Sequence, residues 1–129
     1  MDTLRIEQTK STPLVVFDPE TNTLQIEGQS YPENAFKFYE PVFLWLEERL
    51  AAIGGMTLSI YIHMPYINTS SSKCMMMLLE KLEQAHQSGK KIGICWYYDP
   101  DNEMALECAE EFSEDLTLPF EIRPAEAEK

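Results

Sequence analysis

A run of hydroxyl side chains in the middle of the chain carries the strongest signal for chemistry. Segment 66–73 reads Tyr-Ile-Asn-Thr-Ser-Ser-Ser-Lys. It separates a β-like stretch, Thr57 to Met64, from a helical apolar pattern that begins near Cys74. Backbone N–H groups at the start of a helix lack intrahelical partners and carry about half a positive charge, so they stabilise either a capping oxygen or a phosphate. The run is therefore a candidate both for a helix cap and for a phosphorylation switch.

Both interpretations stay open on the residues alone. For capping, Asn68 or Thr69 is the N-cap, and Ser70 to Ser72 form a solvated first turn. If the run is a switch, the start of the helix stabilises the phosphate, which can reach Lys73 one turn on. The neighbouring sequence offers no arginine cluster to bind it. A phosphate within a partner-binding surface adds about 1.5 to 2 negative charges to an already acidic chain. Repulsion and desolvation then predict a local block of binding rather than an internal rearrangement.

Motifs for catalysis or cofactor binding are missing from the sequence. It contains no G-x-x-x-x-G-K-S/T, no G-x-G-x-x-G and no G-x-S-x-G, and so lacks the common phosphate cradles and the nucleophile elbow. The carboxylates of the expected third helix lie at solvent-facing spacings, not beside an apolar pocket residue that would raise a pKa. We predict a protein that is not an enzyme and binds no cofactor.

The cysteines and histidines form no metal or disulfide pattern. Cys74, Cys95 and Cys108 are widely spaced, odd in number and without a C-x-x-C pair. Each falls on an apolar strand or helical stripe, which predicts small core residues. His63 lies within a strand pattern, and His86 fits the last turn of a helix, where a cation interacts favourably with the helix dipole. We predict no metal site.

Hydrophobic periodicity predicts an α/β fold: a single domain with a mixed β-sheet and covering helices. Strands are expected at 14–17, 23–27, 57–64, 91–96 and 120–122, and helices at 35–53, from about 74 to 88 and from 100 to 112. Pro41 interrupts the first helical pattern, and we expect a short turn there before the main helix. Asp99 and Pro100 are expected as the N-cap and first residue of the third helix. We predict one domain over residues 1–124 and a short acidic tail, disordered, over 125–129.

The charge distribution excludes several partner classes. The net charge is −12, and the segment 99–129 holds −9 of it, with eleven acidic and two basic residues. Such a surface repels nucleic acid and anionic lipid, whereas both a basic protein partner and a simple solvated acidic helix are compatible with it. The first residues do not resemble a signal peptide, and no apolar run approaches the roughly 18 residues of a membrane span. We expect a cytoplasmic protein without nucleic-acid or membrane binding.

Several short segments, in this order and spacing, resemble one known family. They are 11–13 (Ser-Thr-Pro), 30–34 (Ser-Tyr-Pro-Glu-Asn), 66–71 (Tyr-Ile-Asn-Thr-Ser-Ser), 82–86 (Leu-Glu-Gln-Ala-His) and 96–99 (Trp-Tyr-Tyr-Asp), the last followed by Asn102-Glu103. The chain resembles, from Ser11 to Ile122, the SiaC family of bacterial regulatory phosphoproteins, small α/β proteins related in fold to anti-sigma-factor antagonists (STAS-like). It departs from the family pattern at Ser72, where an apolar residue is familiar.

The resemblance implies a partner-switching regulator. A cognate serine/threonine kinase would phosphorylate Thr69 and a PP2C-type phosphatase would remove the phosphate. The unmodified form would bind and stimulate a diguanylate cyclase, so that cyclic di-GMP rises and favours biofilm or aggregation, and phosphate on Thr69 would block that binding. The implied partner-binding residues are Tyr31, Pro32, Glu33, Asn34, Tyr66, Asn68, Thr69, Ser70 and Ser71.

Three alternatives remain open at this point. Segment 30–34 either flanks the surface around Thr69 or only sets the start of the first helix, with Pro32 fixing the turn in both cases. The fold would also suit an anti-sigma-factor antagonist, whose kinase would recognise a sigma factor as well. A small-ligand-binding or enzymatic α/β domain would instead show a ligand pocket.

Overall fold

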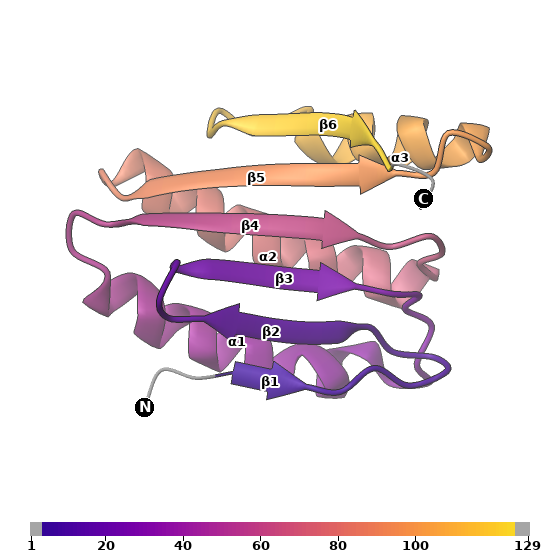
Figure 1. Cartoon of the computed structure of the whole chain (residues 1–129), viewed down its shortest axis with the longest axis horizontal. Coiled ribbons are helices and arrows are strands. Elements are labelled where there is room, and N and C mark those ends of the chain that lie inside the picture. The colour runs from indigo at the N-terminus through magenta and orange to yellow at the C-terminus, as the bar shows by residue number, and fades with distance from the viewer. Residues whose placement is uncertain (1–3, 126–129) are drawn as a thin grey trace.

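The computed structural model describes residues 4–125, in which six strands form one sheet and three helices pack against it (Figure 1). The strands are β1 (Leu4–Ile6), β2 (Leu14–Asp18), β3 (Thr23–Glu27), β4 (Thr57–His63), β5 (Lys91–Tyr98) and β6 (Phe120–Pro124). The helices are α1 (Ala35–Ala52), α2 (Thr69–Gln87) and α3 (Glu103–Ser113). The eight predicted elements occur in the predicted order, which confirms the α/β fold with a mixed sheet. The predicted tail lies, except for Ala125, outside the described residues.

The order of the strands places all three helices on one face. The strands follow one another across the sheet in chain order; the β1–β2 and β2–β3 pairs are antiparallel, and the three remaining pairs are parallel. Each parallel pair is joined by one helix, and right-handed crossovers that always step in the same direction put their helices on the same side. Figure 1 shows α1, α2 and α3 behind the sheet, while its front face carries no helix in the described part of the chain.

Alternation along the strands separates the two faces. In β4, Leu58, Ile60 and Ile62 are fully buried under the helices, whereas Tyr61 and His63 point to the open face. The carboxyl ends of β4 and β5 lie at the same edge of the sheet because the two strands are parallel. The loops from that edge lead directly into α2 and α3.

One strand was not predicted. β1 covers only three residues at the edge of the sheet, with Leu4 and Ile6 half-buried. Three residues are too few to show an alternating pattern, and the strand forms because β2 offers it a partner edge. The pairing of Arg5 with Val16 is antiparallel.

The helix starts differ from the predictions for identifiable reasons. α1 runs without a break through Pro41, and the predicted turn is wrong. Pro41 is exposed, so solvent can hydrate the carbonyl that loses its partner, and burial of Tyr39, Val42 and their neighbours outweighs the proline cost of about 3 kcal/mol. The apolar pattern placed the start of α2 near Cys74, but the helix begins at Thr69 with Asn68 as its N-cap, which confirms one of the two predicted caps. This asparagine cap offsets the weak helix propensity of the serines.

The start of α3 is also later than predicted. The N-cap is Asn102, whose Oδ1 accepts the Met104 N–H at 3.1 Å, and the proposed Asp99 cap is wrong. The Asp99 carboxylate is occupied elsewhere, at 3.0 Å from His63 Nε2. Pro100 therefore lies in the turn before the helix.

Candidate functional site

Two segments that are far apart in the sequence lie side by side at the end of the sheet where β4 and β5 finish. Ser30 and Ile67 form an isolated parallel bridge. The Ser30 N–H donates to the Tyr66 carbonyl at 2.8 Å, and the Asn68 N–H donates to the Ser30 carbonyl at 2.9 Å. Segments 30–34 and 66–72 therefore form one surface, as one of the two alternatives for segment 30–34 expected.

Both helices that start at this surface are capped by asparagine. Asn34 Oδ1 accepts the N–H of Lys37 at 3.1 Å, and Asn68 Oδ1 accepts the N–H of Ser71 at 2.8 Å. Segment 30–34 thus sets the start of α1 as well, and its two alternatives hold together. Because Asn68 is the cap of α2, Thr69 is the first helical residue and its hydroxyl is not needed for capping.

A buried hydroxyl cluster, made of Ser30, Tyr39 and Ser71, lies beneath this surface. Ser30 Oγ lies 2.7 Å from the Tyr39 hydroxyl and 2.8 Å from Ser71 Oγ, and all three residues are fully buried. Burial raises the pKa of Tyr39 to about 12. The predicted solvated position of Ser71 is wrong, because the helical turn after the cap points its side chain into the core. Its predicted contact with a partner stays a prediction.

The other hydroxyls of the run face outward. Thr69 and Ser70 are exposed, and Ser72 is half-buried. Lys73 is exposed one turn after Thr69. A phosphate on Thr69 would meet the positive end of the α2 dipole and stand near one flexible lysine. That environment tolerates a phosphate but has no preformed fork of guanidinium donors to hold it.

The chain's three arginines make their described contacts elsewhere. Arg49 donates to Asn22 Oδ1 at 2.7 Å, and its guanidinium lies 5.1 Å from the centre of the Phe17 ring. Arg5 and Arg123 each pair with a nearby glutamate. These contacts support a phosphate that acts on a partner rather than one that rearranges the chain itself.

Two exposed tyrosines border the hydroxyls. The rings of Tyr31 and Tyr66 meet edge to face with centres 5.8 Å apart, and the two residues remain 37% and 52% exposed. Exposed aromatic side chains held in a fixed geometry are typical anchors of protein interfaces. Pro32 is half-buried, and its carbonyl lies 3.5 Å from Asn68 Nδ2. We call this region the Thr69 surface; its exposed members are Tyr31, Glu33, Asn34, Tyr66, Thr69 and Ser70.

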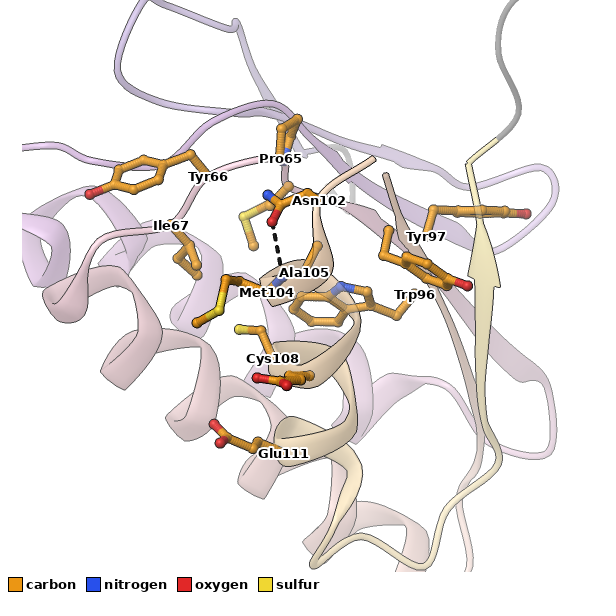
Figure 2. A pocket seen from close by; sticks show the side chains of 13 residues that line it. Pro65, Tyr66, Ile67, Trp96, Tyr97, Asn102, Met104, Ala105, Cys108 and Glu111 are labelled. Atoms are coloured by element: carbon orange, nitrogen blue, oxygen red, sulfur yellow. Dashed lines mark hydrogen bonds between the residues drawn. The ribbon is translucent and has the colours of Figure 1, made fainter. Parts of the chain in front are cut away.

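A groove without a counterpart among the sequence predictions lies next to the Thr69 surface (Figure 2). It has a volume of about 300 Å³ and runs between α3 and the loop that leads into α2; we call it the α3 groove. Ile67 and Met104 face each other across it, and Cys108 lies one turn farther along α3. The signal in the sequence was the helical spacing of Met104 and Cys108; the sequence analysis assigned Cys108 to the core.

The core assignment holds for only two of the three cysteines. Cys74 and Cys95 are buried, as predicted, whereas Cys108 is half-buried and lines the α3 groove. Met104 is 69% exposed. Both residues lie on the flank of α3 that borders the groove, next to the buried side that Ala109 and Phe112 occupy.

The two histidines lie where the patterns placed them. His63 ends β4 on the open face, with Nε2 at 3.0 Å from Asp99 Oδ1 and Nδ1 at 3.8 Å from Glu27 Oε2. His86 occupies the last turn of α2. Within residues 4–125, no three or more His, Cys, Asp and Glu side chains come together in a way that could hold a metal ion. The helices of that same part are also too short or too polar to span a membrane.

Comparison with known proteins agrees with this geometry. A family model described as "SiaC family regulatory phosphoprotein" matches residues 6–125. An uncharacterized protein of Pseudomonas aeruginosa (strain UCBPP-PA14) is 42% identical over 123 residues, which are 95% of this chain and 97% of that protein.

Two crystal structures of Pseudomonas aeruginosa proteins show the same fold. Apo-SiaC superposes with a TM-score of 0.89 at 41% identity, over 95% of this chain and 99% of that one. SiaC in complex with the diguanylate cyclase SiaD, of which SiaC is described as the activator, superposes with a TM-score of 0.89 at 42% identity and the same coverage. Since the family model spans nearly the whole chain, this protein belongs to the SiaC family of regulatory phosphoproteins.

Proposed function

We propose that this chain is a cytoplasmic, phosphorylation-controlled partner-switching regulator whose unmodified form binds and activates a diguanylate cyclase. The similarity to SiaC, which has been crystallised with the cyclase SiaD as its activator, supports this class of partner. The chain itself acts by binding and carries out no reaction. Its effect on the cell is a rise in cyclic di-GMP, which favours biofilm formation or aggregation.

The observation that carries the proposal is the exposure of Thr69 within a surface suited to binding. Thr69 stands beside the Tyr31–Tyr66 pair and is free of the capping role, which Asn68 performs. Its hydroxyl can therefore enter the active site of a kinase while the helix start stays intact. A PP2C-type phosphatase would need the same access to remove the phosphate.

The phosphate would act by local block. It places about 1.5 to 2 negative charges on a partner-binding surface of a chain whose net charge is already −12. A partner that covers Thr69 would have to strip water from these charges without an opposite charge from this chain beyond Lys73. Binding is therefore lost although the fold of the regulator is unchanged.

The first test measures binding and activation of the SiaD cyclase from Pseudomonas aeruginosa by three forms of the chain. The unmodified protein and Thr69→Ala should both bind and stimulate, with a loss near that of one neutral contact, about 1 kcal/mol. Thr69→Glu should bind at least about tenfold more weakly. Calorimetric titration gives the affinities, and formation of cyclic di-GMP gives the activation.

A matched control separates local block from added charge in general. Thr21 is exposed in the loop between β2 and β3, at the opposite end of the sheet from Thr69. Thr21→Glu adds the same charge and should bind like the unmodified chain. Equal weakening by Thr21→Glu and Thr69→Glu would contradict the local block.

The second test concerns the modified residue. Incubation with the cognate kinase and ATP should add one phosphate at Thr69, and Thr69→Ala should abolish this labelling whereas Ser72→Ala should not. Mass spectrometric mapping of the phosphate to Ser70 or Ser72 would move the switch to a neighbouring residue.

A further inference from the structure

His63 is the last residue of β4, at a point where three segments of the chain meet. Its carbonyl accepts the Gly28 N–H at 2.9 Å, and Gly28 leads into segment 30–34. The chain itself runs on from His63 to Thr69 at the start of α2. The imidazole ring faces Asp99, the first residue after β5, with Nε2 3.0 Å from Oδ1. His63 therefore connects both segments of the Thr69 surface with the loop before α3.

The contact between His63 and Asp99 also fixes the start of α3. The Asp99 carbonyl accepts the Asn102 N–H at 2.9 Å, and Asn102 Oδ1 caps α3 by accepting the Met104 N–H at 3.1 Å. A displacement of Asp99 would therefore move this cap. Because β4 and β5 are neighbouring parallel strands, the ring links the two loops that leave this end of the sheet (Figure 1).

The His63 ring stands between two carboxylates. Asp99 Oδ1 faces Nε2, and on the other side Oε2 of Glu27, from β3, lies 3.8 Å from Nδ1. A neutral imidazole carries one N–H, so it donates to one carboxylate while its second nitrogen turns a lone pair towards the other. The imidazolium carries an N–H on both nitrogens and attracts both carboxylates. A proton therefore completes this arrangement.

The other titratable and charged groups near the ring are two tyrosines and one arginine. Tyr97 on β5 is the register partner of His63, and Tyr61 precedes His63 on the same face of β4. A hydrogen bond with Cys95, together with burial, raises the pKa of Tyr97 above its ordinary value of 10. Arg123 lies beyond Tyr97 on β6 and pairs with a glutamate of its own strand. Because carboxylates ionise near pH 4 and tyrosines near pH 10, a change of charge in this cluster between pH 6 and pH 8 falls on the histidine.

We propose that His63 is a proton-sensitive positioning residue for the Thr69 surface. When protonated, its ring attracts Asp99 and Glu27 at once, so that the segments leading into α1, α2 and α3 keep one relative position. When the ring is neutral, the attraction to Glu27, whose strand leads towards segment 30–34, is lost. The chain then binds its partner more weakly, because more ordering is left for the binding step. In taking the diguanylate cyclase as this partner, the inference rests on the proposed function.

The expected effect is moderate because the three groups are partly exposed. The side chains of His63, Glu27 and Asp99 are 25%, 50% and 36% exposed, so water weakens their attraction. The favourable contribution is present where the histidine is protonated, and it is lost as the pH rises towards 8. We expect binding to be about threefold weaker at pH 8 than at pH 6.

The first experiment measures the affinity for the SiaD cyclase of Pseudomonas aeruginosa at pH 6 and pH 8. His63→Gln keeps an N–H donor for Asp99 but takes up no proton, so the threefold fall should disappear. His86→Gln, in the last turn of α2, is the matched control and should keep the fall of the wild-type chain. The pH dependence of the cyclase itself is common to all variants. Equal pH dependence in the two glutamine variants would overturn the proton-sensitive role of His63.

A double-mutant cycle at pH 6 tests the contact with Asp99. His63→Leu removes the donor and Asp99→Ala removes the acceptor, and each should weaken binding about fivefold, more than His63→Gln does. The double variant should bind about as weakly as the weaker single variant, because the two residues act as one unit. Thermal melts check that each variant is folded. Losses that multiply in the double variant would mean two independent effects and would overturn the positioning role.

A measurement on the chain alone separates this inference from the proposed function. If the wild-type chain binds no cyclase, the proposed function fails, and His63 is then tested by NMR titration between pH 5.5 and pH 8.5. The amide resonances of Gly28 and Asn102 should shift with the same midpoint as the His63 ring, and His63→Gln should abolish these shifts. Gly89, whose N–H donates to the His86 carbonyl, should follow the His86 ring instead. Amides of Gly28 and Asn102 that stay unshifted while the His63 ring titrates would overturn the proposal.

Discussion

Thr69 and Ser71 are two residues apart, carry the same functional group and have opposite surroundings. Thr69 is exposed at the first position of α2, and Ser71 is fully buried against Ser30. Two steps along a helix turn the side chain by about 200°, from solvent to core. The comparison teaches that the hydroxyl run divides into a part available for modification and a part that holds the helix in place.

The buried half of the comparison ties together three elements. Ser30 precedes α1, Tyr39 belongs to α1 and Ser71 belongs to α2, so their hydrogen bonds fix the relative position of the two helix starts. The exposed half makes no comparable bonds in the described structure. Rigid support under a modifiable residue keeps the surface in one geometry for kinase, phosphatase and target.

The largest expected effect comes from placing a negative charge at the buried Ser71, compared with the same charge at the exposed Thr69. Ser71→Glu buries a carboxylate without a cationic partner and should cost about 4 kcal/mol or more of the free energy of unfolding. Thr69→Glu should leave stability unchanged or raise it by about 0.3 to 1 kcal/mol, because an acidic group favours the helix N-terminus. Denaturant unfolding followed by circular dichroism measures both. Similar losses of unfolding free energy in the two variants would contradict the distinction between a buried Ser71 and an exposed Thr69.

The pH dependence of stability tests the burial of the Tyr39 hydroxyl, and its expected effect is of intermediate size. The pKa of Tyr39 is raised from 10 to about 12 in the folded protein, so the folded state holds this proton more tightly than the unfolded chain. The stabilisation is therefore complete below about pH 10 and is lost as the pH rises through 12, with a maximum loss of roughly 3 kcal/mol. Tyr39→Phe should lack this part of the alkaline decline. Parallel curves for the two proteins would show that the hydroxyl is not buried in solution.

The smallest expected effect is the difference in stability between a variant of the cap, Asn68, and a variant of its neighbour, Thr69. Asn68→Ala removes the oxygen that accepts the Ser71 N–H and should cost about 1 kcal/mol. Thr69→Ala should change the free energy of unfolding by less than about 0.5 kcal/mol, since the threonine does not cap the helix. Paired thermal melts are sufficient. The reverse order would return the capping role to Thr69.

Most of the fold could be predicted because its elements have strong local patterns. The alternation of Leu58, Ile60 and Ile62 with polar residues marks β4, and the two-faced strand is present. The mistakes concern boundaries that depend on distant partners: β1 needs the edge of β2, and Asp99 is removed from its expected capping role by His63. Pro41 is tolerated within α1 only because neighbouring residues pack into the core.

The residues of the site were predicted from the sequence, whereas their arrangement was predicted only as one of two alternatives. The motifs at 30–34 and 66–72 were recognised separately, and only the bridge between Ser30 and Ile67 makes them one surface. The α3 groove escaped prediction because Met104 is as apolar as a core residue, and its exposure depends on the distance between α3 and the loop before α2. Sequence periodicity gives the direction of a side chain but not what stands opposite it.

The sequence by itself determined the class of the fold, the acidic surface and the position of a hydroxyl run between a strand and a helix. These follow from local periodicity and composition, which act over a few residues. The tertiary structure alone decided that Asn68 is the cap, that Ser71 is buried and that Thr69 is exposed. The reason is physical: the phase of α2 is set by the packing of its apolar stripe against the sheet and by hydrogen bonds to Ser30, and neither constraint is contained in the segment that carries the hydroxyls.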